Sequence, residues 1–278
     1  MDLKHKVAIV TGASAGIGRE LAREFARQGA RVTCAARREQ KLAETVALIQ
    51  DEGGEAIAVP TDITDREQVN HMVAETLKHF NQIDLLFNNA ARLQAIGASW
   101  EIDPDDWWED VQVNLLGTMM CCHAVLPHMI QRNNGIIINM EGGGGSGGAN
   151  IGASAYGCSK AAIMRFTQSL AGELERIGSA VLVFCVNPGF VQTDMIKHAL
   201  DTPHKQQWLS NTMSLIGSKK EVAPERCAKV TMRLLQIACP ELNGRTFRQE
   251  LDFDLIEQNL QRIKQEDLFT LHYKRLTE

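Results

Sequence analysis

Tyr156 and Lys160 are the residues of this sequence whose types and spacing best suit acid–base chemistry. They open a helical pattern that continues to Leu170, so we expect them one turn apart on one helix face, with side chains starting roughly 5–6 Å apart. A free phenol has a pKa of about 10, and a neighbouring ammonium favours the phenolate, so Lys160 is predicted to lower the pKa of Tyr156. Such a pair can exchange a proton near neutral pH. Taken alone, it is more often a plain surface pair of helix neighbours.

A glycine-rich turn near the N-terminus predicts a phosphate-binding unit. A short apolar run over residues 6–10 is followed by this turn and then by an amphipathic pattern that ends near Gln28. A strand, such a turn and a helix in this order let backbone N–H groups and the helix N-terminus approach a pyrophosphate. The residues that we expect to bind it are Gly12, Ser14, Gly16, Ile17 and Gly18.

The next predicted strand, over residues 30–35, ends in Ala36-Arg37-Arg38. An NAD-binding site would carry an acidic residue at this point for the ribose 2′-hydroxyl, whereas guanidinium groups suit a 2′-phosphate. We therefore expect Arg37 and Arg38 to favour NADP(H) over NAD(H). The alternative is that the two arginines only flank a solvated helix start.

Polar residues follow two further predicted strands and a long predicted helix. Asp62 and Ile63 stand where the base of a dinucleotide would lie, although Asp62 serves equally well as a turn or helix-capping residue. Asn89 and Ala90 follow the strand over residues 83–88, where asparagine side chains can also act as scaffold. Asn114 lies inside a helix predicted from about 104 to 130, and its mildly unfavourable helix propensity indicates a local role.

Strands alternate with helices along nearly the whole chain, and no internal repeat interrupts them. This pattern predicts an α/β fold, a single domain over residues 1–251 in which a doubly wound parallel sheet of about seven strands carries helices on both faces. Ligands of such folds bind beyond the carboxyl ends of the strands. Residues 195–218 read as a mobile segment, and residues 252–278 as a C-terminal tail with helical tendency.

Composition excludes several classes of function. The 278 residues carry a formal net charge of −5, which gives no basic field for nucleic acid or an anionic membrane. We found no run of about twenty apolar residues and no signal sequence, so we expect a cytoplasmic protein. The seven cysteines include no C-x-x-C pair and the histidines no ligand spacing, so we expect reduced thiols and no metal.

Taken together, the motifs resemble those of the short-chain dehydrogenase/reductase family across about residues 6–250. The residues that carry the resemblance are Thr11-Gly12-x-x-x-Gly16-x-Gly18, Asn88-Asn89-Ala90, Asn114, Tyr156-x-x-x-Lys160 and Pro188-Gly189 with Thr193. The resemblance implies a Rossmann fold and an NAD(P)-dependent oxidoreductase that acts on a carbonyl or a secondary alcohol. It also implies cofactor contacts from Asn89, Ala90, Tyr156, Lys160, Pro188, Gly189, Val191 and Thr193.

The same resemblance implies the catalytic roles. Tyr156 would give its proton to the developing alkoxide, Lys160 would hold the nicotinamide ribose, and Asn114 would hold a water that relays protons to Lys160. The family's serine is missing, because its usual position falls at Gly142 or Gly143. We expect Ser146 to replace it, the alternative being that Ser146 only fills the loop, and Ser154 is a weaker candidate.

Substrate and assembly are less constrained by the sequence. The glycine loop is similar to that of chlorophyll b reductases, and Ala91 stands where the family usually has glycine. We expect a mainly apolar pocket walled by residues 92–96, the glycine loop, Phe190 and residues 195–213. The family commonly pairs helices corresponding to 104–130 and 155–177, which suggests a homodimer or homotetramer, although their apolar residues would also suit a monomer's core. The alternative function is a cofactor-binding sensor without catalysis.

Overall fold

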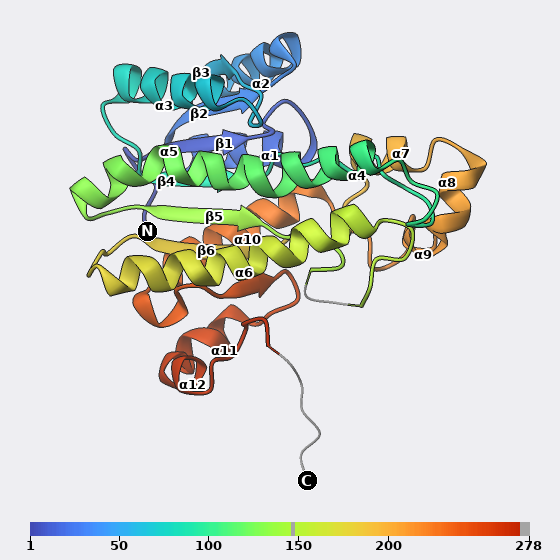
Figure 1. The fold of residues 1–278 in the computed structure, drawn as a ribbon. Coiled ribbons are helices and arrows are strands. Elements are labelled where there is room, and N and C mark those ends of the chain that lie inside the picture. Colours follow the sequence, from blue (N-terminus) through green and yellow to red (C-terminus); the bar gives the residue numbers. More distant parts are fainter. Residues whose placement is uncertain (146–147, 273–278) are drawn as a thin grey trace.

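A seven-stranded sheet forms the centre of the computed structural model, which describes residues 1–145 and 148–272 (Figure 1). Every neighbouring pair of strands is parallel, and the strand order is β3-β2-β1-β4-β5-β6-β7. The strands are β1 (Val7–Thr11), β2 (Arg31–Ala36), β3 (Glu55–Pro60), β4 (Leu85–Asn88), β5 (Ile136–Met140), β6 (Leu182–Asn187) and β7 (Thr246–Arg248). The predicted doubly wound parallel sheet is confirmed.

Helices cover both faces of the sheet, because side chains along each buried strand alternate between two cores. Val10 packs into one core and its neighbour Ile9 into the other. The first core is closed by α1 (Gly16–Arg27), α2 (Glu39–Asp51) and α10 (Pro224–Ile237), and the second by α3 (Arg66–Phe80), α5 (Gly117–Arg132) and α6 (Ser154–Arg176).

The helix predicted from about 104 to 130 is interrupted by a wider turn. It begins as α4 (Pro104–Val111), where Asp103 caps the first turn, passes through a π-helical segment, Gln112–Leu116, and continues as α5. Single π-turns inside α-helices occur mostly at functional sites. Here the π-turn carries Asn114.

The same continuous stretch, Pro104–Arg132, is long and apolar enough to cross a membrane by length and composition alone. This differs from our expectation that no stretch of the chain would approach that limit. Cys121, Val125 and Met129 of α5 are nevertheless fully buried and belong to the core that covers the sheet. The stretch therefore packs as a core helix of this domain.

The segment predicted to be mobile folds into three short helices at the carboxyl end of the sheet (Figure 1). They are α7 (Asp194–Ala199), α8 (Pro203–Trp208) and α9 (Ser210–Met213). Ala199, Leu200 and Leu209 are buried against Leu93 and Ile96 from the loop after β4. These non-local apolar contacts order a segment that has no clear helical pattern of its own.

The C-terminal part, as far as residue 272, packs beyond β7 rather than over the carboxyl ends of the strands (Figure 1). A 3-10 turn at Pro240–Leu242 precedes β7, and α11 (Phe253–Gln258) and α12 (Leu260–Gln265) follow it. The side chains of Phe253 and Ile263 join the core, and the Thr246 N–H donates to the carbonyl of Phe269. This part of the tail thus covers the β7 edge of the sheet.

Candidate active site

The turn between β1 and α1 is a close-packed glycine cradle. A β-carbon on Gly18 would collide with the Gly12 carbonyl and lie 2.5 Å from Asn89 Nδ2. Asn89 Nδ2 itself donates to the Thr11 carbonyl at 2.9 Å and to the Gly12 carbonyl at 3.4 Å. Asn89 therefore holds the turn in shape, which is the scaffold role that its position also allowed.

The N-terminus of α1 faces this cradle and has no capping side chain. No acidic residue lies in its first turn either. The first N–H groups of a helix have no intrahelical acceptor and carry partial positive charge. A cofactor phosphate would supply the missing acceptor.

The two arginines after β2 lie at the outer edge of the cradle. Arg38 Nη2 donates to Ser14 Oγ at 3.2 Å, and Arg37 Nη1 is 3.8 Å from Asp62 Oδ2. The other oxygen of Asp62 accepts from the backbone N–H and the hydroxyl of Thr64. Asp62 is therefore a turn residue through one oxygen and faces the site through the other.

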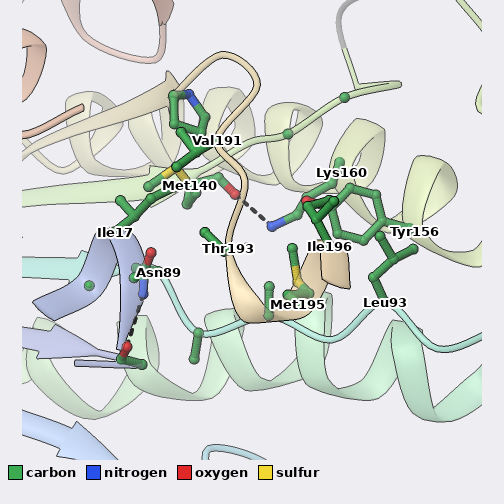
Figure 2. Close-up of a pocket in the computed structure, with 18 of the residues that line it drawn as sticks. Ile17, Asn89, Leu93, Met140, Tyr156, Lys160, Val191, Thr193, Met195 and Ile196 are labelled. Carbon is green, nitrogen blue, oxygen red and sulfur yellow. Dashed lines mark hydrogen bonds between the residues drawn. The ribbon is translucent and has the colours of Figure 1, made fainter. Parts of the chain in front are cut away.

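Tyr156 and Lys160 both belong to α6 and face the same cavity, as their spacing predicts. Lys160 is 1% exposed, and its Nζ donates to the Met140 carbonyl at 2.9 Å. The same Nζ lies 5.4 Å from the centroid of the Tyr156 ring (Figure 2). The end of β5 thus fixes the lysine beside the phenol.

The pKa of Tyr156 is raised, contrary to our expectation that Lys160 lowers it. Burial is the largest cause, and the carboxylates of Glu141 and Asp110 act in the same direction. Burial also lowers the pKa of Lys160 to about 8, against the opposing influence of Cys185 and Glu141. The prediction considered only the charge of Lys160, one helix turn away. Desolvation disfavours the charged form of both groups and outweighs that charge.

Asn114 is fully buried and its carboxamide is occupied by the protein. Its Oδ1 accepts from the Arg92 N–H at 2.8 Å, and its Nδ2 donates to the Arg92 carbonyl at 2.9 Å and to Ser159 Oγ at 3.1 Å. Asn114 therefore joins the loop after β4 to α6, one residue before Lys160. Its predicted role in holding a relay water stays a prediction.

The glycine loop after β5 passes close to the Tyr156 phenol. A β-carbon on Gly142 would collide with the Tyr156 hydroxyl, whereas one on Gly143 would meet only Asn150 Oδ1, at 3.9 Å. Ser146, predicted to replace the family's serine, lies outside the described residues. The Ser154 hydroxyl accepts from Trp107 Nε1 and lies 3.0 Å from Ser99 Oγ, so it is engaged elsewhere.

The turn after β6 closes the opposite wall of the site. Asn187 Oδ1 accepts from the Gly189 N–H at 2.9 Å, and Gly189 has a φ of 76°, in the left-handed region. Thr193 follows with a buried Oγ1 that has no hydrogen-bond partner among the described residues. Buried hydroxyls are normally paired, so this atom awaits a ligand.

One cavity of about 630 Å³ joins these parts, with the glycine cradle at one end and Tyr156 at the other (Figure 2). Every predicted site residue within 1–145 and 148–272 lines it except Asn114. The lining residues include Ile17, Ile63, Ala90, Pro188 and Val191. The predicted walls of the substrate pocket also face it, through Leu93, Phe190, Met195, Ile196 and Leu209.

Glu141 and Asn187 belong to the cavity wall, although neither was assigned to the site from the sequence. Glu141 is 1% exposed, and its Oε2 accepts from Asn187 Nδ2 at 3.1 Å. A carboxylate directly after the apolar strand β5, at the edge where ligands bind, was a signal that could have identified it.

The cavity fits a nicotinamide dinucleotide. The cradle at Gly12 and Gly18 admits no side chain, the N-terminus of α1 is uncapped, and the buried Thr193 hydroxyl lacks a partner. A pyrophosphate would fill the cradle and accept from the N–H groups of α1, and a carboxamide would pair with the Thr193 hydroxyl.

Known proteins share the sequence and the fold of this chain. Residues 6–204 match the family model of short chain dehydrogenases. The chain is 37% identical to a short chain dehydrogenase of Pseudocercospora fijiensis over 88% of this chain and 80% of that protein. It is 34% identical to a 3-oxoacyl-(acyl-carrier-protein) reductase of Synechocystis over 88% of this chain and 95% of that protein.

A solved structure extends the likeness to three dimensions. The crystal structure of a variant of actinorhodin polyketide ketoreductase with NADPH superposes with a TM-score of 0.77 at 29% identity, covering 87% of this chain and 95% of that one. Family match, relatives and site geometry agree. The chain belongs to the short-chain dehydrogenase/reductase family and is an NAD(P)-dependent oxidoreductase.

Proposed function

We propose that this protein is an NADP(H)-dependent reductase of a largely apolar carbonyl compound, with Tyr156 as the acid that protonates the substrate oxygen. The observation that carries the proposal is that Tyr156 and Lys160 line the same cavity as the glycine cradle. Oxidation of the corresponding secondary alcohol is the reverse reaction at the same site.

The protonation state of Tyr156 supports the direction of reduction. Burial raises its pKa, so the hydroxyl carries its proton at neutral pH and can donate it. Lys160, beside the ring, would hold the nicotinamide ribose. When bound, the nicotinamide supplies the hydride for the carbonyl carbon.

The apolar wall supports a substrate with a large hydrocarbon part. Leu93, Ile196 and Leu209 form a cluster against which the Tyr156 ring packs. Trp208 of α8 packs edge-on against Trp100, which is 82% exposed, with ring centroids 6.4 Å apart. The likeness to chlorophyll b reductases covers the glycine loop alone, so chlorophyll b enters only as one compound of the test panel.

The preference for NADP(H) rests on the residues after β2. Arg37 and Arg38 line the cavity there, and β2 ends in alanine where an acidic residue would repel a phosphate. Ser14 orients the Arg38 guanidinium through the hydrogen bond described above. The structure of the related actinorhodin ketoreductase contains NADPH, which agrees with this preference.

We also propose a homodimer or homotetramer in the cytoplasm, joined through the face of α4, α5 and α6. Trp108, Leu116 and Ile130 are exposed large apolar residues on α4, the π-helical turn and α5. Met164 and Leu170 of α6, by contrast, are buried in the subunit's own core. Sedimentation velocity at micromolar concentration tests the assembly, and a monomer would contradict it.

The function is tested by following NADPH consumption with a panel of aldehydes, ketones, quinones and chlorophyll b. We expect turnover by the wild type and none by Tyr156→Phe, which should still bind NADPH because the ring is retained. NADPH binding without turnover of any panel member would favour the sensor instead.

A further inference from the structure

We propose that Glu141 is a positioning residue of this active site: its buried carboxylate supplies a fixed negative charge at the end of β5, where Lys160 is held, and anchors Asn187 at the end of the neighbouring strand β6. The effect of Glu141 on turnover rests on the proposed function, which this inference deepens. The inference goes beyond that function because neither the tyrosine and lysine pair nor the glycine cradle requires a carboxylate at this point.

The first argument is the cost of burying this group. Glu141 is 1% exposed and stands directly after β5, where its backbone N–H donates to the Val186 carbonyl. Removing a carboxylate from water is costly unless charge and hydrogen bonds compensate. A β-carbon on Gly145 would lie 2.6 Å from Glu141 Oε1, so the glycine run leaves the space that the carboxylate needs.

Glu141 also lies near the two groups that are expected to act on cofactor and substrate, Lys160 and Tyr156. Its neighbour Met140 accepts the hydrogen bond from Lys160 Nζ, so the ammonium is held one residue away along β5. Glu141 raises the pKa of both Lys160 and Tyr156, which places its field on the two groups expected to act on cofactor and substrate.

A chain of hydrogen bonds also links Glu141 to the ends of two neighbouring strands, β5 and β6, at the edge of the cavity. Asn187 Nδ2 donates to Glu141 Oε2 at 3.1 Å, and Asn187 Oδ1 accepts from the Gly189 N–H at 2.9 Å. Glu141 therefore fixes which way the Asn187 carboxamide faces. Through it, the end of β5 is tied to the Pro188-Gly189 turn that lines the site.

Other titratable groups face the same region. Cys185 on β6 also lies near Lys160, but burial raises the pKa of this thiol, so it is uncharged at neutral pH and exerts no field on the lysine there. Asp110 on α4 acts on Tyr156 and is held by Arg92. Arg248 and Glu250 line the cavity from the β7 side. Among these groups, Glu141 is the carboxylate that acts on both Tyr156 and Lys160 and also holds a wall of the site.

The test uses Glu141→Gln, which removes the charge and keeps an oxygen for Asn187. In the cofactor-free protein labelled with 13C at lysine Cε, the Lys160 signal, assigned with Lys160→Met, should titrate near pH 8 in the wild type. In Glu141→Gln the midpoint should fall by about one pH unit. The pH above which NADPH affinity declines should fall by the same amount.

Control variants test whether the change in the Lys160 midpoint comes from the charge of Glu141 or from its shape. They also separate this inference from the proposed function. Glu173→Gln, which removes an exposed carboxylate on α6, should leave the midpoint unchanged, and Glu141→Asp should restore it. If Glu141→Gln does not fold, Glu141→Gln/Lys160→Met should fold, because no uncompensated ammonium remains. An unchanged midpoint in Glu141→Gln, or failure of both variants to fold, would overturn the inference. Absence of NADPH turnover in the wild type would count against the proposed function alone.

Discussion

The Tyr156 hydroxyl lies directly against the backbone of Gly142, where any β-carbon would collide with it. If the family's serine corresponds to position 142, its side chain is excluded by this contact. If it corresponds to position 143, there is space for a side chain and no steric reason for glycine. Neither position supplies a hydroxyl, and the replacement by Ser146 stays our prediction.

We predict that Gly142→Ala lowers kcat about 100-fold, because displacing a reacting group by about 1 Å has an effect of that size. The Kd for NADPH should change less than threefold, since the cradle is distant along the cavity. Steady-state kinetics and fluorescence titration with NADPH measure the two quantities. Gly148→Ala is the matched control, because a β-carbon there meets nothing within 4 Å. Wild-type kcat in Gly142→Ala would contradict the contact.

The cofactor preference gives a second prediction. Arg38→Ala should raise the Kd for NADPH about 10- to 100-fold, the effect of losing one charge-assisted hydrogen bond to phosphate, and leave the Kd for NADH within twofold. Calorimetric titration with both nucleotides measures this. Arg176→Ala, at the exposed end of α6, should change neither. Equal losses for both nucleotides would show that Arg38 acts on the shape of the turn through Ser14.

The sequence predicted the fold class and most residues of the cavity wall, because both depend on local patterns. Alternating strands and helices imply a parallel sheet, and its carboxyl edge collects the strand ends. Asn89 and Asp62 show the limit of that reasoning. Asn89 binds the backbone at the end of β1 and Asp62 binds the backbone of its own turn, roles that the sequence offered only as alternatives.

Other features required the tertiary structure. The raised pKa of Tyr156 depends on burial and on Glu141 and Asp110, which lie outside the helix that carries Tyr156. The contacts of Asn114 with Arg92 depend on how the loop after β4 meets the π-turn. Helices α7 to α9 are ordered by apolar contacts with residues about a hundred positions earlier, so the local pattern indicated only a mobile segment.

Buried thiols predict an alkaline limit to stability. Burial raises the pKa of Cys34 from 9.0 to about 12. Between these values the unfolded thiol loses its proton while the folded one keeps it, so the free energy of unfolding falls as pH rises. At pH 10.5 this single group should account for about 2 kcal/mol of lost stability.

Between pH 8 and pH 10.5 the free energy of unfolding of Cys34→Ala should therefore fall by about 2 kcal/mol less than that of the wild type. This difference does not depend on how stable the variant is at pH 8. Urea unfolding at both pH values measures the difference. Cys158→Ala should follow the wild-type dependence, because its thiol is exposed on α6. Parallel losses in Cys34→Ala and the wild type would contradict the assignment.

The unpaired hydroxyl of Thr193 gives a prediction with opposite signs for stability and binding. Thr193→Val keeps the shape of the side chain and removes a buried oxygen that has no partner among the described residues. The cofactor-free protein should become more stable by about 1 kcal/mol, because an unsatisfied buried group is destabilising. The Kd for NADPH should rise about fivefold, because the bound cofactor loses that partner.

A threonine whose hydroxyl is already paired provides the contrast. Thr76 Oγ1 donates to the Met72 carbonyl at 2.7 Å and lies 2.9 Å from Thr33 Oγ1, in the core away from the cavity. Thr76→Val should lower the free energy of unfolding by about 1 kcal/mol and leave the Kd for NADPH unchanged. Thermal unfolding of both variants with and without saturating NADPH measures all four quantities. If Thr193→Val destabilises the cofactor-free protein as Thr76→Val does, the Thr193 hydroxyl has a structural partner and is not waiting for the cofactor.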